Sequence, residues 1–156
     1  MLAAQALLAL IAFLLGAALF SFMNVVAWRL PRGKNPLTGR SFCPQCGAAL
    51  TAADLVPVFS WLALHGRCRH CGARIPARYL AVELLGGVLA LGCRWRFGAA
   101  YALADGLFGI RWQGLAALAL CGVLLSIALI DAETQLIPNR LNAAVAVLAV
   151  VALLLS

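Results

Sequence analysis

The chain has 156 residues, of which 65% are hydrophobic and only 11% are charged. Its mean hydropathy of +1.00 lies far above that of a soluble domain and excludes an ordinary soluble enzyme. The net charge of +7 would suit a nucleic-acid partner, but a basic loop beside apolar segments is explained by the positive-inside bias of membrane proteins. We therefore expect a lipid bilayer around the chain and no nucleic-acid partner.

The first element is an uncharged run of 27 residues from Leu2 to Trp28, interrupted only by Gln5, Ser21 and Asn24. At about 1.5 Å per residue, a helix of this length exceeds the roughly 30 Å thickness of the hydrocarbon core. A cleaved signal peptide is the competing interpretation, but the run is too long and no Lys or Arg precedes it. We predict a first transmembrane helix over residues 1–28.

A hydrophilic insert follows, which we predict to be a separate domain over residues 29–78. It holds eight of the twelve Lys and Arg residues, and its glycines and prolines interrupt any long helix. Because positive charge marks the cytoplasmic side of a membrane, we expect this insert in the cytoplasm and the N-terminus outside.

Four cysteines in the insert form two pairs with metal-ligand spacing, Cys43-Pro-Gln-Cys46 and Cys68-Arg-His-Cys71, each followed by glycine. Such a pair folds as a tight knuckle, and two knuckles complete a tetrahedral site of four sulfur ligands. The spacing predicts a small zinc-ribbon-like site with a structural Zn²⁺, because a closed ligand shell leaves no position for a catalytic water. Metal binding would also supply folding free energy. Nearby arginines should favour the thiolate form: Arg40, Arg67, Arg69 and Arg74.

Other interpretations of the cysteines remain open. Disulfides are uncommon in a reducing cytoplasm, and a thioredoxin-like redox site would need only one of the two pairs. His65 and His70 are possible substitute ligands, although beside four cysteines at this spacing we expect them to be supporting or solvated residues.

Residues 79–156 are expected to form the remaining membrane region, which gives an all-α polytopic membrane protein with about four transmembrane helices. We place its spans at about 79–93, 114–130 and 141–156 from the apolar runs. Residues 97–113 are too short and too charged for a span, so we assign them to an external loop or interfacial helix.

Two carboxylates lie near the predicted cytoplasmic boundary. For Glu83, ion pairing with Arg78 or Arg74 is the simplest explanation.

Asp131 directly follows the third apolar run, where a carboxylate is costly unless it has a function. We expect Asp131 to be buried at the boundary, where a second carboxylate would let the pair share a proton, as in aspartic proteases. The alternative is that Asp131 is only the first residue in water, while Glu133 is expected to be solvated.

Together these stretches resemble the prepilin peptidase family, the bifunctional leader peptidases and N-methyltransferases of type IV pilus and type II secretion systems. Residues 16–31 are similar to the family's first span and its basic exit. Ile130 to Pro138 is similar to the segment that carries the first of two catalytic aspartates, which maps onto Asp131. Four stretches are similar to the cytoplasmic cysteine domain and the second span: Ser41–Cys46, Pro57–Leu62, Gly66–Gly72 and Arg78–Glu83.

The resemblance implies cleavage of leader peptides from type IV prepilins or pseudopilins at the cytoplasmic face of the bacterial inner (plasma) membrane, with Asp131 catalytic. It also implies N-methylation of the new N-terminus with S-adenosylmethionine, if that activity is retained. The family's second catalytic aspartate belongs to a Gly-x-Gly-Asp motif that this sequence lacks, and Asn139 stands where the family often has aspartate. We therefore expect a truncated or fragmentary member, inactive as a peptidase unless another polypeptide or a second copy supplies a carboxylate.

A second hypothesis comes from a different functional class. In it, the chain is a non-catalytic membrane module whose zinc-stapled insert binds prepilin leaders or pilus and secretion assembly partners, and Asp131 is only a boundary residue. A methyltransferase without peptidase activity has little support, because no glycine-rich nucleotide loop after a strand is visible.

Overall fold

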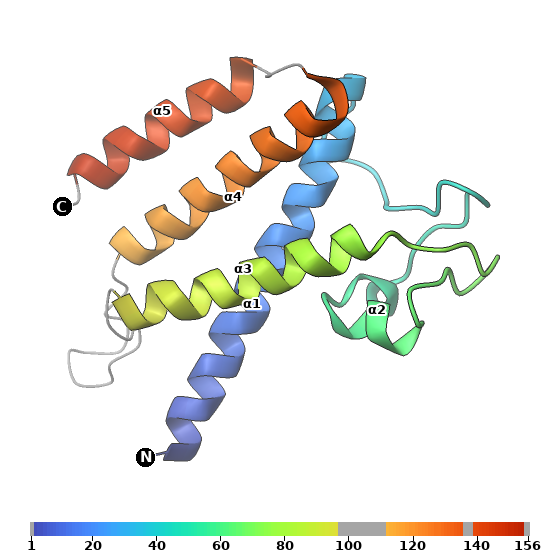
Figure 1. Ribbon diagram of the computed structural model, residues 1–156, viewed down its shortest axis with the longest axis horizontal. Coiled ribbons are helices and arrows are strands. Elements are labelled where there is room, and N and C mark those ends of the chain that lie inside the picture. The colour runs from blue at the N-terminus through green and yellow to red at the C-terminus, as the bar shows by residue number, and fades with distance from the viewer. Residues whose placement is uncertain (1, 97–111, 136–138, 155–156) are drawn as a thin grey trace.

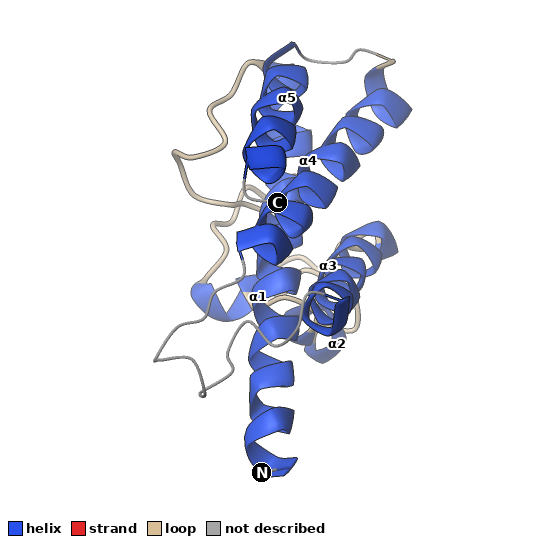
Figure 2. Cartoon of the chain, turned by 90° about the vertical axis from the view of Figure 1, so that its left-hand side faces the viewer, coloured by secondary structure: helices blue, strands red, loops and turns tan. Residues whose placement is uncertain are grey.

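A computed structural model describes residues 2–96, 112–135 and 139–154 of the chain (Figure 1). Within these ranges every regular element is helical, apart from two isolated β-bridges, which confirms the predicted all-α class (Figure 2). The four long helices are α1 (Leu2–Arg29), α3 (Ala77–Arg96), α4 (Trp112–Thr134) and α5 (Asn139–Leu154). The insert between α1 and α3 carries only short elements, namely η1 (Leu30–Arg32), η2 (Ala52–Leu55) and α2 (Phe59–Ala63).

Two of the described helices are long and apolar enough to cross a membrane, over Leu2–Arg32 and Gly114–Thr134. The predicted second and fourth spans lie on α3 and α5. Of these, α5 has a shorter apolar stretch at Leu141–Val151, and α3 is 20 residues long but is not among the helices apolar enough to cross a membrane. Four transmembrane helices therefore remain a prediction. The predicted external loop lies largely outside the described residues, and its last two positions begin α4.

Helix α1 packs against both α3 and α4, and its contact with α3 is made through small residues. A Cβ atom built on Gly16 would lie 2.4 Å from the backbone oxygen of Gly86 and 2.5 Å from the Cβ of Ala90. A Cβ atom on Gly86 would in turn lie 2.5 Å from the Cβ of Phe20, whose side chain is fully buried. The two helices can approach this closely only because glycine has no side chain.

The end of α1 is fixed by a buried arginine that binds backbone carbonyl groups. The Nη1 atom of Arg29 donates to the oxygen of Thr38 at 2.5 Å, and its Nη2 atom donates to the oxygen of Arg40 at 3.0 Å. The Arg29 side chain also contacts the carbonyl of Asn35 at 3.3 Å. A buried guanidinium needs such acceptors to offset its lost hydration. This contact holds the start of the insert against the end of α1.

A cluster of buried apolar side chains joins α1, α4 and α5 at the same level as this arginine. Val26 and Ala27 of α1 pack with Ile130 of α4 and Leu141 of α5, and Ile130 is only 1% exposed. The cluster therefore brings the end of α4 next to the end of α1, from which the insert leaves.

The close crossing of α1 and α3 predicts that Gly86→Ala lowers stability. The added methyl group would press on Phe20 and on the backbone of Gly16, and such overpacking typically costs about 1–3 kcal/mol. Gly92→Ala in the same helix is the matched control, because its Cβ would meet open space while the gain in helix propensity is the same. Thermal unfolding in detergent should show Gly86→Ala to be less stable than Gly92→Ala, and equal stability would contradict this packing.

Candidate functional site

The two cysteine pairs form knuckles with the same backbone hydrogen bonds. In the first, the N–H of Gly47 donates to the oxygen of Cys43 at 2.9 Å, and the N–H of Cys43 donates to the oxygen of Ala48 at 2.9 Å. The second repeats this pattern around Cys68, with distances of 3.0 and 2.8 Å. The glycine after each pair has a positive φ, 70° at Gly47 and 68° at Gly72, which other residues rarely adopt. The knuckle geometry thus accounts for the glycine after each pair.

The knuckles bring the four predicted ligands together: Cys43, Cys46, Cys68 and Cys71. All four Sγ atoms lie within 4.8 Å of one another, and those of Cys43 and Cys71 are 3.9 Å apart. Tetrahedral zinc with Zn–S bonds of about 2.3 Å needs an S–S separation of about 3.8 Å, so the cluster fits such an ion. All six cysteines of the chain are free thiols in this structure. The cluster is therefore a site that could bind a metal such as zinc.

Backbone N–H groups are the main cause of the lowered pKa values in this cluster. The N–H groups of Cys46 and Gln45 lower the pKa of Cys43 to about 7, and those of Cys71 and His70 lower the pKa of Cys68. The N–H of Ala73 also lowers the pKa of Cys71, but burial and the three other thiols outweigh it and raise that pKa to about 11. A divalent cation would offset this repulsion among the sulfur atoms.

The arginines that were predicted to favour the thiolates are not the cause of these shifts. Arg69 instead forms an ion pair with Asp54, at 2.8 Å between Nε and Oδ1. The Thr51 hydroxyl and this guanidinium lower the pKa of Asp54 to about 2. The same carboxylate caps η2 by accepting a hydrogen bond from the N–H of Thr51 at 3.0 Å. Arg69 therefore serves the fold of the insert.

Glu83 occupies a position that sequence reasoning missed. It is 9% exposed and makes no ion pair with Arg78 or Arg74, so the predicted pairing is wrong. Its Oε1 accepts a hydrogen bond from the Ser21 hydroxyl at 2.6 Å, and its Oε2 accepts one from the N–H of Val58 at 2.7 Å. One carboxylate thus joins α1, α3 and the insert.

Arg78 pairs with Glu133 and not with Glu83. This ion pair links the first turn of α3 to the last turn of α4, and both side chains remain partly exposed. Glu133 was expected to be solvated; the residue is exposed, and it also pairs with Arg78 of α3. The pair holds the end of α4 beside the start of α3.

Asp131 lies inside α4, which continues to Thr134 and does not end at Ile130 as predicted. The carbonyl of Asp131 accepts a hydrogen bond from the N–H of Gln135 at 2.8 Å, and Gln135 has a positive φ of 52° that ends the helix. The Asp131 side chain is exposed, so its predicted burial is wrong for this structure. Among the described residues, no second carboxylate shares a hydrogen bond with it.

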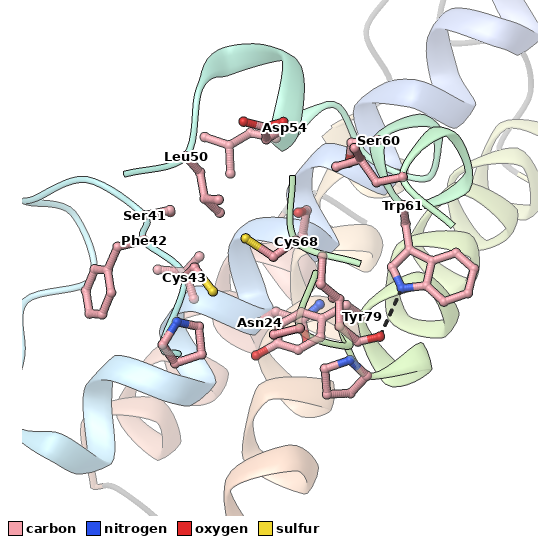
Figure 3. A pocket seen from close by; sticks show the side chains of 18 of the residues that line it. Asn24, Ser41, Phe42, Cys43, Leu50, Asp54, Ser60, Trp61, Cys68 and Tyr79 are labelled. Carbon is pink, nitrogen blue, oxygen red and sulfur yellow. Dashed lines mark hydrogen bonds between the residues drawn. The ribbon is translucent and has the colours of Figure 1, made fainter. Parts of the chain in front are cut away.

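A cavity of about 400 Å³ lies between the cysteine knuckles, α1 and α3. Figure 3 shows Cys43 and Cys68 between Asp54 on one side and Asn24 and Tyr79 on the other. Its polar lining includes Ser21, Asn24 and Glu83, and its aromatic lining consists of Trp28, Phe42, Trp61 and Tyr79. The candidate site therefore combines a metal-binding cluster with a neighbouring cavity that contains a buried carboxylate.

Residues 14–97 match a family model described as the bacterial peptidase A24 N-terminal domain. Three similar proteins, each named prepilin leader peptidase/N-methyltransferase, come from Myxococcus xanthus, Burkholderia pseudomallei strain 1026b and Aeromonas hydrophila. The first is 40% identical over 132 residues, the second 39% over 156 and the third 36% over 154. No solved structure matches the chain.

These alignments cover 83–85% of the present chain but only 36%, 47% and 49% of the three relatives. The chain thus spans half or less of the length of these relatives. The family model covers the whole insert, the second half of α1 and all of α3, including Glu83 and the four clustered cysteines. The match to the full-length relatives extends further, over most of the chain.

The cysteine geometry predicts that the chain purifies with about one bound zinc ion. Cys43→Ser should lose most of this zinc, because the three remaining sulfur ligands leave one position of the tetrahedral site unfilled. Cys121→Ser is the matched control, since Cys121 lies on α4 outside the cluster. Elemental analysis of the two variants in detergent checks this. Equal zinc contents, or no zinc in the unmodified chain, would rule out the site.

Proposed function

Because the chain belongs to the prepilin leader peptidase/N-methyltransferase family and carries the family's bacterial A24 N-terminal domain, we propose that it provides the N-terminal part of a membrane aspartic endopeptidase. Its substrates would be leader-bearing type IV prepilins or pseudopilins. The whole relatives are named for both cleavage and N-methylation, so both activities are proposals for this chain.

We assign the first catalytic carboxylate to Asp131. The observation that carries this assignment is the packing of its neighbour Ile130 against Val26 and Ala27 at the end of α1. This packing sets Asp131 at the level where the insert leaves α1, and the Arg78–Glu133 pair ties the same turn to the start of α3. A carboxylate there would meet a peptide that lies along the cytoplasmic boundary.

Aspartic proteolysis needs two carboxylates that share one proton, so a single Asp131 is not sufficient. The exposure of Asp131 leaves its oxygens open to a second group. We propose that the second carboxylate comes from sequence outside the 156 residues or from another polypeptide. This agrees with the alignments, in which the chain covers less than half of the length of two relatives.

The four clustered cysteines would hold a structural zinc ion, whose role is to fold the insert beside α1 and α3. S-adenosylmethionine would donate the methyl group if methylation is retained, and no described residue is assigned to hold it. We further propose the domain division deduced from the sequence, with the first span at 1–28, the cytoplasmic tetracysteine domain at 29–78 and the peptidase region beginning at 79.

The two long apolar helices and the family membership indicate a membrane protein. We propose a multi-pass arrangement in the bacterial inner membrane, with the N-terminus outside and the insert in the cytoplasm. The position of the helix ends supports this arrangement. The ends of α1 and α4 lie beside the starts of α3 and α5, on the side of the molecule where the insert is. The basic residues of the insert then lie on the side that the positive-inside bias expects.

The test is cleavage of a prepilin-like substrate in membranes by the 156-residue chain and by the chain extended with any sequence that follows in its reading frame. We expect cleavage by the extended form alone, and Asp131→Asn should lower its rate roughly a thousandfold or more. Asp105→Asn, at a position to which the resemblance gives no role, is the matched control.

Cleavage that survives Asp131→Asn would show that the carboxylate assignment is wrong. Failure of the extended form to cleave would instead favour the non-catalytic module, which binds leaders or assembly partners without cutting them.

A further inference from the structure

Glu83 is a buried carboxylate without a counter-ion. Its two oxygens accept hydrogen bonds from neutral donors, the Ser21 hydroxyl and the N–H of Val58, and among the described residues no Lys, Arg or His lies in ion-pair distance. A buried charge is costly unless it is paired. A positively charged group from outside the described residues would therefore stabilise the Glu83 carboxylate by pairing with it.

The nearby arginines do not supply that charge. Arg29 lines the cavity but donates to backbone carbonyls, and Arg69 lines it but pairs with Asp54. Arg74, the third arginine of the lining, belongs to the second knuckle and forms no ion pair with Glu83. Among the described residues none of these arginines pairs with Glu83, so its carboxylate is free to accept a cation from a ligand.

The backbone that faces Glu83 is strained. Val58 has φ 65° and ψ −54°, and the N–H of Phe59 donates to the oxygen of Pro57 at 2.7 Å, which defines a γ-turn of the rare kind. A β-branched residue in this conformation costs on the order of 1–3 kcal/mol and persists only where its surroundings enforce it. Here the turn directs the Val58 N–H at the Glu83 carboxylate, and this hydrogen bond fixes the Glu83 side chain in the cavity wall.

The rest of the cavity suits an organic cation with a neighbouring acceptor. The rings of Trp28, Trp61 and Tyr79 line it, and aromatic faces attract ammonium groups. Arg32 and Lys34 already lie over the Trp28 ring, and Arg78 lies over the Tyr79 ring. Among the described residues no cation lies over Trp61, so this ring is the one offered to a ligand. Asn24 also lines it, is 6% exposed, and has an Nδ2 atom with no hydrogen-bond partner in the described structure. A carbonyl group brought in by a ligand would satisfy this amide.

We propose that this cavity binds the N-terminus of a peptide, with the α-ammonium group on Glu83 and the first carbonyl next to Asn24. The inference rests on the proposed function, because an N-methyltransferase must hold the amine that it modifies. It deepens that function by assigning a site for the amine to residues of this chain. The sulfonium of S-adenosylmethionine shares the positive charge of an ammonium, so the experiment must separate the two.

Glu83→Gln is a clean test because the amide keeps the shape and both hydrogen bonds. Its oxygen can accept from the N–H of Val58, and its NH₂ group can donate to the Ser21 hydroxyl, so only the charge is lost. Glu133→Gln is the matched control, because Glu133 lies outside the cavity lining.

Binding of a short apolar peptide is measured calorimetrically in detergent, with a free or an acetylated N-terminus. We expect the unmodified chain to prefer the free amine by at least about tenfold, and Glu83→Gln to lose that preference. Glu133→Gln should keep it. Equal binding of the two peptides by the unmodified chain, or an unchanged preference in a folded Glu83→Gln variant, would overturn the proposal.

A third titration with S-adenosylmethionine separates the two cations. If Glu83→Gln weakens its binding and leaves the peptide unaffected, the cavity holds the methyl donor and the proposal is wrong. Asp131→Asn is expected to bind the free-amine peptide normally. Loss of cleavage with normal peptide binding would therefore concern the proposed peptidase function, whereas loss of the preference for the free amine would concern the amine site alone.

Discussion

The arrangement of α1, α3 and the insert depends on one buried carboxylate. Glu83 accepts hydrogen bonds from Ser21 on α1 and from Val58 in the insert, while its own helix crosses α1 at a pair of glycines. A wider helix crossing would move the carboxylate away from Ser21. The strained turn at Val58 is then held by the contact between the insert and α3, and the cavity beside the cysteines forms around the same group.

The insert has little apolar core of its own, so it relies on anchors. Two cysteine knuckles gather four sulfurs at one point, and the buried Arg29 binds the carbonyls that follow η1. Each anchor satisfies groups that would otherwise be costly: a metal ion would neutralise neighbouring thiolates, and the carbonyls solvate a guanidinium. Together with Glu83 they hold a polar segment against the ends of α1 and α3.

The cysteine cluster was predictable because its signal is local, four cysteines and two glycines at fixed spacing. The apolar runs likewise indicated the helices. The contacts of Glu83 were not predictable, because its partners lie 25 and 62 residues away and no periodic pattern connects them. The predicted apolar run stops at Ile130, but α4 continues through Asp131 to Thr134. Residues 131–134 contain no glycine or proline, so the helix continues to Thr134 and ends where Gln135 adopts a positive φ.

The most direct test of the central junction is amide hydrogen exchange at Val58. We predict that this N–H is protected in the unmodified chain and in Glu83→Gln, since both offer an acceptor, and that Glu83→Ala removes the protection. Measurement in detergent by mass spectrometry, with peptides short enough to isolate residues 57–59, would resolve it. Exchange at Val58 in the unmodified chain as fast as in an exposed loop would contradict the account, because the insert would then not be docked on Glu83.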